Sequence, residues 1–259
     1  MAPRSIWNGT LAFGMVRVPI KLYSAIEPKG IGFREIHTKD ESTLRHRRIC
    51  RKEGKPVDKD QIGKGYEISS GEYVLLEPDE INAAAGDGAK TIEIEEFVDV
   101  SSIDPFQFSK TYFLGCREDA TPFSVLSAAL EKTGRAGIGR FSFHNREYLV
   151  AVRAFQERLA LHTLRFSDEI VDVGDLDMPG GGKKPTAKEV KMARQLIAGL
   201  TDEFEPDGFQ DEYRAAVMDL IERKAEGKKP KKSKSKKKKP TGDLSKALEE
   251  SLAAQGASN

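Results

Sequence analysis

The stretch RFSFHNREYLVAVRAFQERLALHTLRF, residues 140–166, decides the fold class of this 259-residue chain. Its aromatic and aliphatic residues fall into three segments, which cover 140–143, 147–155 and 158–166. Turn-forming residues separate the segments near Asn145 and Gln156. Short apolar segments at this spacing, with no helical pattern between them, predict consecutive antiparallel strands. Such strands build a β-barrel or a β-sandwich.

The N-terminal residues 6–25 extend this β pattern. Apolar and polar residues alternate over 16–23, which is the period of a half-buried strand. The pair Asn8-Gly9 indicates a turn. Pro19 has no N–H to donate, so the strand that contains it is expected at a sheet edge or at a bulge.

The rest of the body is also mainly β. Further strand structure is predicted over 66–76, with a turn at Gly71, and over 91–100 and 111–115, with helices over 77–85 and 121–133. The glycine-rich residues 134–140 superficially resemble a phosphate-binding loop, but such a loop follows a strand and precedes a helix. We therefore interpret them as a flexible connector.

Two helices are predicted after the β body. Thr186 and Glu189 form a capping box that opens the first helix, and residues 210–225 form the second. These helices either cover the β body or form an arm towards a partner. Leucines then recur every fourth residue over 244–252. That spacing indicates either a short amphipathic helix, which folds on a partner, or a frayed end.

Charge is distributed unevenly along the chain. The tail holds nine lysines with no acid among them: Lys228, Lys229, Lys231, Lys232, Lys234, Lys236, Lys237, Lys238 and Lys239. Subtracting these nine charges from the formal net charge of +1 leaves −8 for the rest of the chain. A block of like charge this long stays disordered and serves as an interaction tail. We therefore predict a β-barrel core over 1–184, a helical arm over 185–226 and a disordered basic tail over 227–259.

A second concentration of positive charge lies within the core. Residues 44–55 read LRHRRICRKEGK and carry six arginines and lysines against one acid, Glu53. The flanking residues 31–40 and 56–65 are too polar to form a core of their own. We interpret the segment as an excursion from the β body that carries cations to a polyanion. A solvated basic loop is the alternative interpretation.

Composition excludes several classes of protein. The two cysteines, Cys50 and Cys116, cannot build a disulfide framework or a four-cysteine zinc site, and they suit a reducing compartment. No apolar run approaches the roughly 18 residues of a membrane span. The N-terminus lacks the apolar region of a signal peptide. We therefore expect a soluble intracellular protein.

Motifs of catalysis are absent from the sequence. None of the four histidines lies at a metal-ligand spacing, and the G-x-S-x-G, Walker A and G-x-G-x-x-G motifs do not occur. His162 is expected to be a satisfied barrel residue rather than a catalytic base. The chain is predicted to have no enzymatic activity, no cofactor and no metal. Weak lyase activity of the tail stays open, because a lysine amine can form a Schiff base with an abasic sugar.

Several motifs resemble bacterial Ku. The longest is SIWNGTLAFG at 5–14, followed by VPIKLY at 18–23. The shorter motifs are GYE at 65–67, YV at 73–74, IGRF at 138–141, REYLV at 146–150 and F-x-D-x-Y at 209–213. Together they span about residues 5–225, which is nearly the whole body.

The resemblance implies a Ku-type β-barrel with an inserted bridge, followed by C-terminal helices. It implies a homodimer that forms a ring around a double-stranded DNA end in non-homologous end joining. It also implies recruitment of the ATP-dependent DNA ligase D, in the cytoplasm at the nucleoid. The bridge falls on about 31–65. Many bacterial members carry a C-x-x-C knuckle there, but Glu53 stands at the second cysteine position, so no bound zinc is expected.

A protein that accepts any DNA end should contact phosphates rather than base edges. The predicted lining of the ring is Arg45, Arg47, Arg48, Arg51 and Lys52. Lys21, Arg135 and Arg140 are weaker candidates, because the sequence does not show which way they face. The lysine tail is a second contact. The alternative function is that of an architectural protein, which coats or bridges duplex DNA through the tail and uses the barrel as a scaffold.

Overall fold

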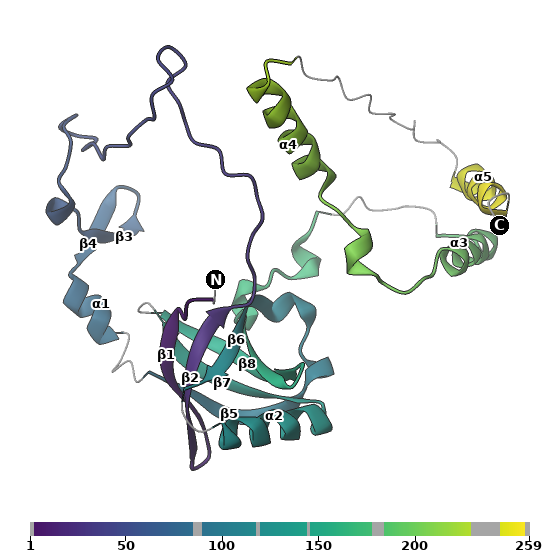
Figure 1. Ribbon diagram of the computed structural model, residues 1–259, viewed down its shortest axis with the longest axis horizontal. Coiled ribbons are helices and arrows are strands. Elements are labelled where there is room, and N and C mark those ends of the chain that lie inside the picture. Colours follow the sequence, from purple (N-terminus) through teal and green to yellow (C-terminus); the bar gives the residue numbers. More distant parts are fainter. Residues whose placement is uncertain are drawn as a thin grey trace. The chain divides into compact units, whose positions relative to one another are not determined.

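The computed structural model describes residues 3–84, 90–117, 120–143, 146–177, 184–228 and 244–256 (Figure 1). The chain divides by its internal contacts into two compact units. One unit contains residues 1–29 and 33–175, and the other contains 30–32 and 176–259. The predicted boundary at 184 stays a prediction.

The described part of the first unit contains all the strands and two helices. The strands are β1 (Trp7–Phe13), β2 (Val16–Ser24), β3 (Lys64–Ser69), β4 (Glu72–Leu76), β5 (Thr91–Asp99), β6 (Phe108–Cys116), β7 (Arg135–Phe143), β8 (Arg146–Phe155) and β9 (Arg158–Leu164). The helices are α1 (Pro78–Ala84) and α2 (Thr121–Thr133). The second unit contains α3 (Ala187–Gly199), α4 (Glu212–Ala225) and α5 (Leu244–Gly256). Short 3-10 turns occur at Lys59–Gln61, Val100–Ser102, Pro105–Gln107, Ser167–Glu169, Val173–Asp175 and Pro206–Gly208.

Seven strands form a closed barrel in the order β1-β2-β6-β9-β8-β7-β5. The neighbours are antiparallel except β1 and β5, whose parallel pairing closes the barrel. The three strands predicted from residues 140–166 are β7, β8 and β9, which lie side by side. The mainly β class and the barrel are therefore confirmed, and the sandwich is excluded.

The barrel core follows from the alternation of side chains along each strand. The interior is filled by buried aliphatic residues, which include Leu11, Val18, Ile20, Leu22, Ile92, Leu114, Val150, Val152, Leu159 and Leu161. Helix α2 lies beside the barrel strands (Figure 1). Its residues Phe123, Leu126 and Leu130 belong to the same cluster. Trp7 packs against this cluster, with its ring edge-to-face with Phe141 at 5.6 Å between centroids.

Two glycine segments were predicted wrongly, for one physical reason. Asn8-Gly9 is not a turn but lies inside β1, where a Cβ at Gly9 would collide with the carbonyl oxygen of Lys90. Residues 134–140 are not a connector, because β7 already begins at Arg135. A Cβ at Gly139 would collide with the backbone of Glu93 on β5. Glycine therefore permits close approach of two backbones at these positions.

Pro19 does not lie at a sheet edge, because β2 runs between β1 and β6. Pro19 is paired with Thr10 on β1. The Thr10 N–H does not donate to β2 but to the carbonyl oxygen of Lys90, on the other side of β1. The ladder between β1 and β2 therefore needs no N–H from Pro19. Its own carbonyl accepts the N–H of Arg117 at 3.1 Å.

The second unit is helical, and α3 opens as predicted. The Thr186 hydroxyl accepts the Glu189 N–H at 3.3 Å, and the Glu189 carboxylate accepts the Thr186 N–H at 2.7 Å. The leucine repeat near the C-terminus lies in α5, so the helical interpretation of that repeat is the correct one. None of the helices in the described residues combines the length and apolar character needed to span a bilayer.

Candidate nucleic-acid interface

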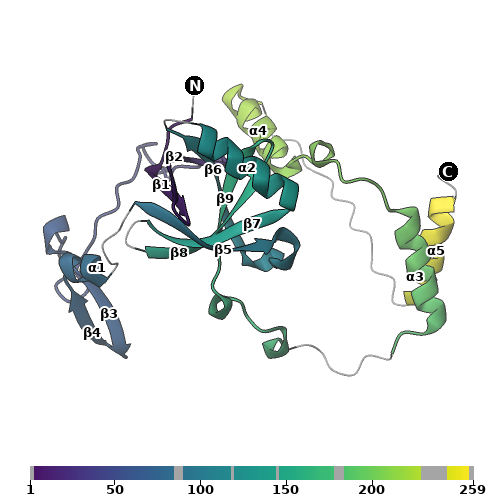
Figure 2. The same ribbon diagram turned by 90° about the horizontal axis from the view of Figure 1, so that it is seen from below.

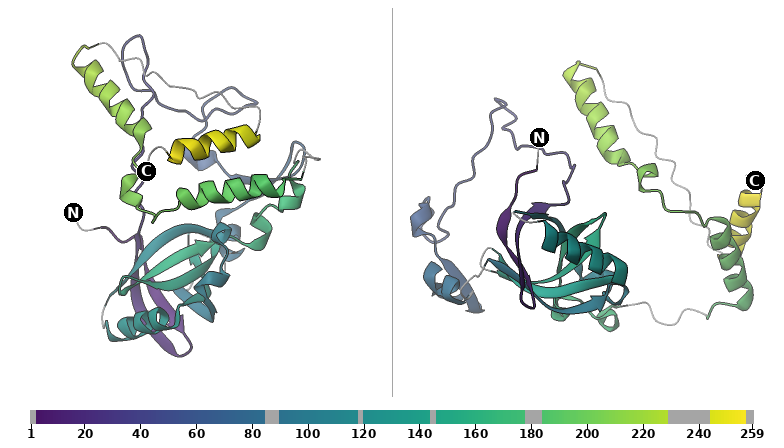
Figure 3. Two further views of the ribbon diagram at one scale, coloured as in Figure 1. Left: turned by 90° about the vertical axis from the view of Figure 1, so that its right-hand side faces the viewer. Right: turned by 60° about the horizontal axis from the view of Figure 1, so that its bottom comes forward.

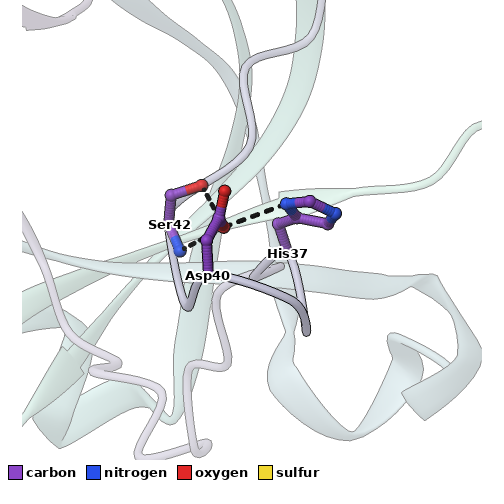
Figure 4. A network of polar contacts seen from close by, with 3 residues as sticks. All are labelled: His37, Asp40 and Ser42. Atoms are coloured by element: carbon purple, nitrogen blue, oxygen red, sulfur yellow. Dashed lines mark hydrogen bonds and ion pairs between the residues drawn. The ribbon is translucent and has the colours of Figure 1, made fainter.

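The basic excursion lies between β2 and β3 in the chain, and two tight turns shape it. In the first turn the His37 N–H donates to the Ser42 carbonyl and the Glu41 N–H donates to the His37 carbonyl, both at 2.8 Å. Asp40 Oδ1 accepts the Ser42 N–H at 3.1 Å, the Ser42 hydroxyl at 2.8 Å and His37 Nδ1 at 2.9 Å (Figure 4).

These hydrogen bonds lower the pKa of Asp40, with the largest contributions from the Ser42 N–H and hydroxyl and then from His37. Each of them stabilises the ionised carboxylate, which accepts but cannot donate. His37 Nδ1 therefore carries the proton that it shares with Asp40. The Asp40 carboxylate thus has its hydrogen-bond partners within the turn, at Ser42 and His37.

The second turn carries the centre of the predicted lining. The Cys50 N–H donates to the Lys55 carbonyl and the Gly54 N–H donates to the Cys50 carbonyl, both at 2.8 Å. Gly54 has a φ of 67°, which suits glycine in the left-handed region. The Val57 N–H donates to the Arg48 carbonyl at 2.9 Å and extends the pairing below the turn. The backbone under these side chains is thereby fixed by hydrogen bonds.

The five predicted lining residues share two properties. All five are exposed: Arg45, Arg47, Arg48, Arg51 and Lys52. Among the residues that the structure describes, none of the five forms an ion pair with an acid. Exposed guanidinium groups on a hydrogen-bonded backbone are well suited to phosphate, which they bind through two parallel hydrogen bonds.

A hollow of about 470 Å³ lies within the same excursion. Its lining includes Arg47, Arg48 and Lys59 as cations, with Asp58 as the acid. Lys59 was not among the sequence candidates, because it stands outside the dense basic run. The folded-back chain places it beside Arg47 and Arg48.

The weaker candidates on the barrel divide into two kinds. Arg140 pairs with both Glu95 and Glu147 at 3.3 Å, and Arg135 pairs with Asp99 at 3.7 Å. Carboxylates at these distances offset the positive charge that a phosphate would meet. Lys21 forms no ion pair among the described residues and is half-buried on β2.

Arg17 is a barrel cation that our sequence candidates omitted. It is exposed and lies on the same strand face as Lys21, since side chains of one parity share a face. Val18, Ile20 and Leu22 point into the core and so direct Arg17 and Lys21 outward. Arg17 could have been identified in the sequence from the two-residue period of β2.

Most of the tail lysines that are predicted to contact DNA lie outside the described residues. This applies to Lys229, Lys231, Lys232, Lys234, Lys236, Lys237, Lys238 and Lys239. Lys228 is described, and its Nζ lies 2.7 Å from the Glu226 carboxylate.

The hairpin β3–β4, which follows the excursion in the sequence, exposes an apolar surface. It forms a two-stranded sheet of its own, and every one of its strand residues is exposed. Tyr66, Tyr73 and Leu75 are 68%, 59% and 72% exposed. An isolated two-stranded hairpin is only marginally stable in water, and exposed apolar patches of this kind mark interaction surfaces.

His162 is buried between β6 and β8 and has both ring nitrogens satisfied. Arg153 Nε donates to His162 Nε2 at 3.0 Å, so the proton of the neutral ring is on Nδ1, which donates to Thr111 Oγ1 at 3.0 Å. Burial, and then the Arg153 charge, lower the pKa of His162 to about 4. This arrangement stabilises the barrel wall, as expected for a satisfied barrel residue. In the described residues no three His, Cys, Asp or Glu side chains are grouped to hold a metal ion.

The free energy of unfolding is expected to fall as the pH falls from about 6.5 to about 4. The unfolded chain protonates His162 near the ordinary pKa of 6.5 and the folded chain only near 4, so acid favours the unfolded state. The loss should reach about 2 to 3 kcal/mol at pH 4.5. Urea unfolding at pH 7 and pH 4.5 measures it. A His162→Gln chain is the control, since glutamine keeps both hydrogen bonds without titrating. Equal pH dependence in the two chains would contradict the assignment.

Comparisons with known proteins cover the barrel and the excursion together. A sequence model of the Ku70/Ku80 β-barrel domain matches residues 12–192. A protein of Solibacter usitatus named Non-homologous end joining protein Ku is 38% identical over 250 residues, which cover 96% of this chain and 93% of that protein. The protein of the same name from Anaeromyxobacter sp. is 41% identical over 226 residues, 86% of this chain and 76% of that protein. The one from Opitutus terrae is 34% identical over 261 residues, 98% of this chain and 93% of that protein.

Proposed function

The chain belongs to the Ku family, and from this premise we propose that it binds double-stranded DNA ends without regard to sequence, in break repair by non-homologous end joining. The observation that carries the proposal is the set of exposed arginines at 45, 47, 48 and 51, which have no acidic partner among the described residues. Phosphates are the same at every DNA end, so contacts to them carry no sequence preference.

We propose that two copies form the ring. A closed ring loads only where the duplex has an end and slides once it is threaded, so topology supplies the end preference that phosphate contacts lack. The exposed tyrosines and leucines of hairpin β3–β4 support a second copy as the partner, because association would bury this apolar surface. A two-fold dimer presents the same hairpin from both copies.

Aspartate at both Tyr73 and Leu75 is expected to dissociate the dimer. Burying either side chain contributes roughly 1.5 to 3 kcal/mol, so loss of both from each copy should raise the dimer Kd by at least about a hundredfold. Sedimentation at micromolar concentration should then give the mass of one chain. The matched control is Val125→Asp on α2, where an equally exposed apolar side chain lies on a different surface. A double variant that keeps the mass of two chains would rule out this hairpin as the interface.

The alternative is an architectural protein that binds duplex DNA through its tail, and a chain ending at Glu226 separates the two functions. We expect this chain, which lacks all nine tail lysines, to bind ends still. Its salt dependence should be shallower by at most about 8 in log–log slope for each copy, at roughly 0.9 per phosphate contact. Anisotropy of a labelled 30-base-pair duplex over a salt series measures both. A full-length chain with the nine lysines replaced by glutamine controls for length. Complete loss of binding in both chains would favour the architectural function.

We also propose that the DNA-bound ring recruits the ATP-dependent ligase D, acts in the cytoplasm at the nucleoid and has no catalytic site of its own. The helical arm supports a protein partner. It exposes apolar side chains on α3 and after it, including Ile197, Leu200, Phe204 and Phe209. Exposed aromatic and aliphatic residues of this density are typical of protein–protein interfaces.

A further inference from the structure

The outer wall of the barrel carries a row of aromatic side chains. Figure 2 shows β2, β6 and β9 as successive strands of this wall, and Figure 3 shows α2 beside the same barrel in both views. Tyr23 on β2 is paired with Phe113 on β6, and Phe113 is paired with Ala160 on β9. Beyond Ala160, the ring of Phe155 on β8 stacks with that of Phe113, at 6.0 Å between centroids and 25° between planes.

These rings face away from the barrel interior. The adjacent leucines on β2 and β6 are buried in the core, and successive side chains of a strand point to opposite faces. Tyr23 and Phe113 are half-buried, and Phe155 is 38% exposed. None of the three belongs to a hydrophobic cluster of the described residues. A Cβ at Gly115 would lie 2.9 Å from the Tyr23 ring, so the glycine lets this ring lie close to the wall.

The same four strands are strongly basic. Strands β2, β6, β8 and β9 contain one acid, Glu147, and six arginines and lysines: Arg17, Lys21, Lys110, Arg146, Arg153 and Arg158. Glu147 pairs with Arg140 on the next strand, β7. The guanidinium of Arg153 lies 5.6 Å from the centroid of the Phe155 ring. By contrast, β5 contains four acids and no arginine or lysine. Positive charge and aromatic rings therefore gather on the same part of the barrel wall.

Aromatic rings beside cations are the surface that a single strand of nucleic acid needs. Its bases stack on the rings, and the cations hold its phosphates. A duplex keeps its bases paired and stacked inside, so it offers few free base faces to the rings. A neutral protein segment could cover the rings, but it would leave the positive charge of the wall without a partner. The wall therefore fits an unpaired strand best.

We propose that the outer wall over β2, β6, β9 and β8 binds the unpaired strand of a DNA end. Bases of the overhang stack on Tyr23, Phe113 and Phe155. Its phosphates lie on the cations of this face that form no ion pair among the described residues: Arg17, Lys21 and Arg158. The inference extends the proposed end binding, because the excursion holds the duplex and the wall holds the overhang. An end with an overhang is then bound more tightly than a blunt end.

The first test maps the contacts of the full-length wild-type chain with a single strand of about 12 thymidines, some of them replaced by 5-iododeoxyuridine. Ultraviolet light joins an iodinated base to an aromatic ring that is stacked on it, and mass spectrometry identifies the linked residue. We expect the cross-links at Tyr23, Phe113 and Phe155. Cross-links that fall only in the excursion or the lysine tail overturn the inference, and so does the absence of binding to the single strand.

The second test replaces Tyr23, Phe113 and Phe155 together by leucine, which keeps an apolar side chain and removes the stacking. The Kd for the same single strand should rise at least about tenfold in salt of about 0.5 M, where phosphate contacts are screened. Binding of a blunt duplex at low salt should change by less than about threefold. The matched control is Phe97→Leu on β5, since Phe97 is 43% exposed but lies among acids. Unchanged single-strand binding in the leucine chain, with loss of the dimer mass, overturns the inference in favour of a protein interface.

Thermal melting shows whether the leucine chain is folded. If it is not, Arg17→Gln with Arg158→Gln decides, because both side chains are exposed. This variant should make the salt slope for the single strand shallower by about 1.4, at roughly 0.7 per contact, and an unchanged slope overturns the inference. A wild-type chain that binds the single strand through the three rings but binds no duplex end supports the wall and overturns the proposed end binding.

Discussion

Protein bound to a linear duplex is expected to stay on that DNA in 1 M salt once the DNA has been ligated into a closed circle. The ring proposed here carries about ten lining cations in two copies, which gives a log–log salt slope near −9. Raising the salt from 0.1 M to 1 M then weakens phosphate binding by about nine orders of magnitude. Retention in 1 M salt is therefore topological, because phosphate contacts alone cannot produce it.

Three controls define this experiment. Protein added after the circle has closed should not load, and protein on unligated linear DNA should be stripped by the same salt. The chain ending at Glu226 should be trapped as efficiently as the full chain, because threading depends on the barrel and bridge. Gel filtration in 1 M salt separates trapped from free protein. Equal release from circular and linear DNA would show that no closed ring surrounds the duplex.

Replacing Arg45, Arg47, Arg48 and Arg51 together by glutamine is expected to abolish tight binding of DNA ends. If both copies use all four arginines, the salt slope becomes shallower by about 7, at roughly 0.9 per contact. Affinity at 0.15 M salt should fall by at least about a thousandfold. Stability should hardly change, because these side chains are exposed and unpaired among the described residues.

The structure offers a matched control for this variant. Arg135→Gln with Arg140→Gln removes charges that are already offset by Asp99, Glu95 and Glu147. We expect it to change the affinity by less than about tenfold. A lysine series at the four excursion positions keeps the charge but loses the two-pronged guanidinium contact, so its slope should persist while its affinity decreases. An unchanged slope in the glutamine variant would exclude the excursion as the DNA contact.

The strands of the barrel could be predicted from the sequence, because their cause is local. Alternation of apolar and polar residues along 16–23 encodes which side of that strand faces the core. The capping box at Thr186 encodes the start of α3 in the same local way. The roles of Gly9 and Gly139 could not be predicted from their neighbours in the sequence. The backbone atoms that leave no room for a Cβ at these positions belong to distant residues, Lys90 and Glu93.

The β class, the helical arm and the dense positive charge of the excursion and the tail can be inferred from local sequence patterns. How the barrel closes, through the parallel pairing of β1 with β5, depends on contacts between segments far apart in the chain. Contacts of the same kind bring Arg140 to Glu95 on another strand and α5 back to α3. Period and charge density are properties of neighbouring residues. The partner of a side chain is set by which distant segments the fold brings within a few ångströms of it.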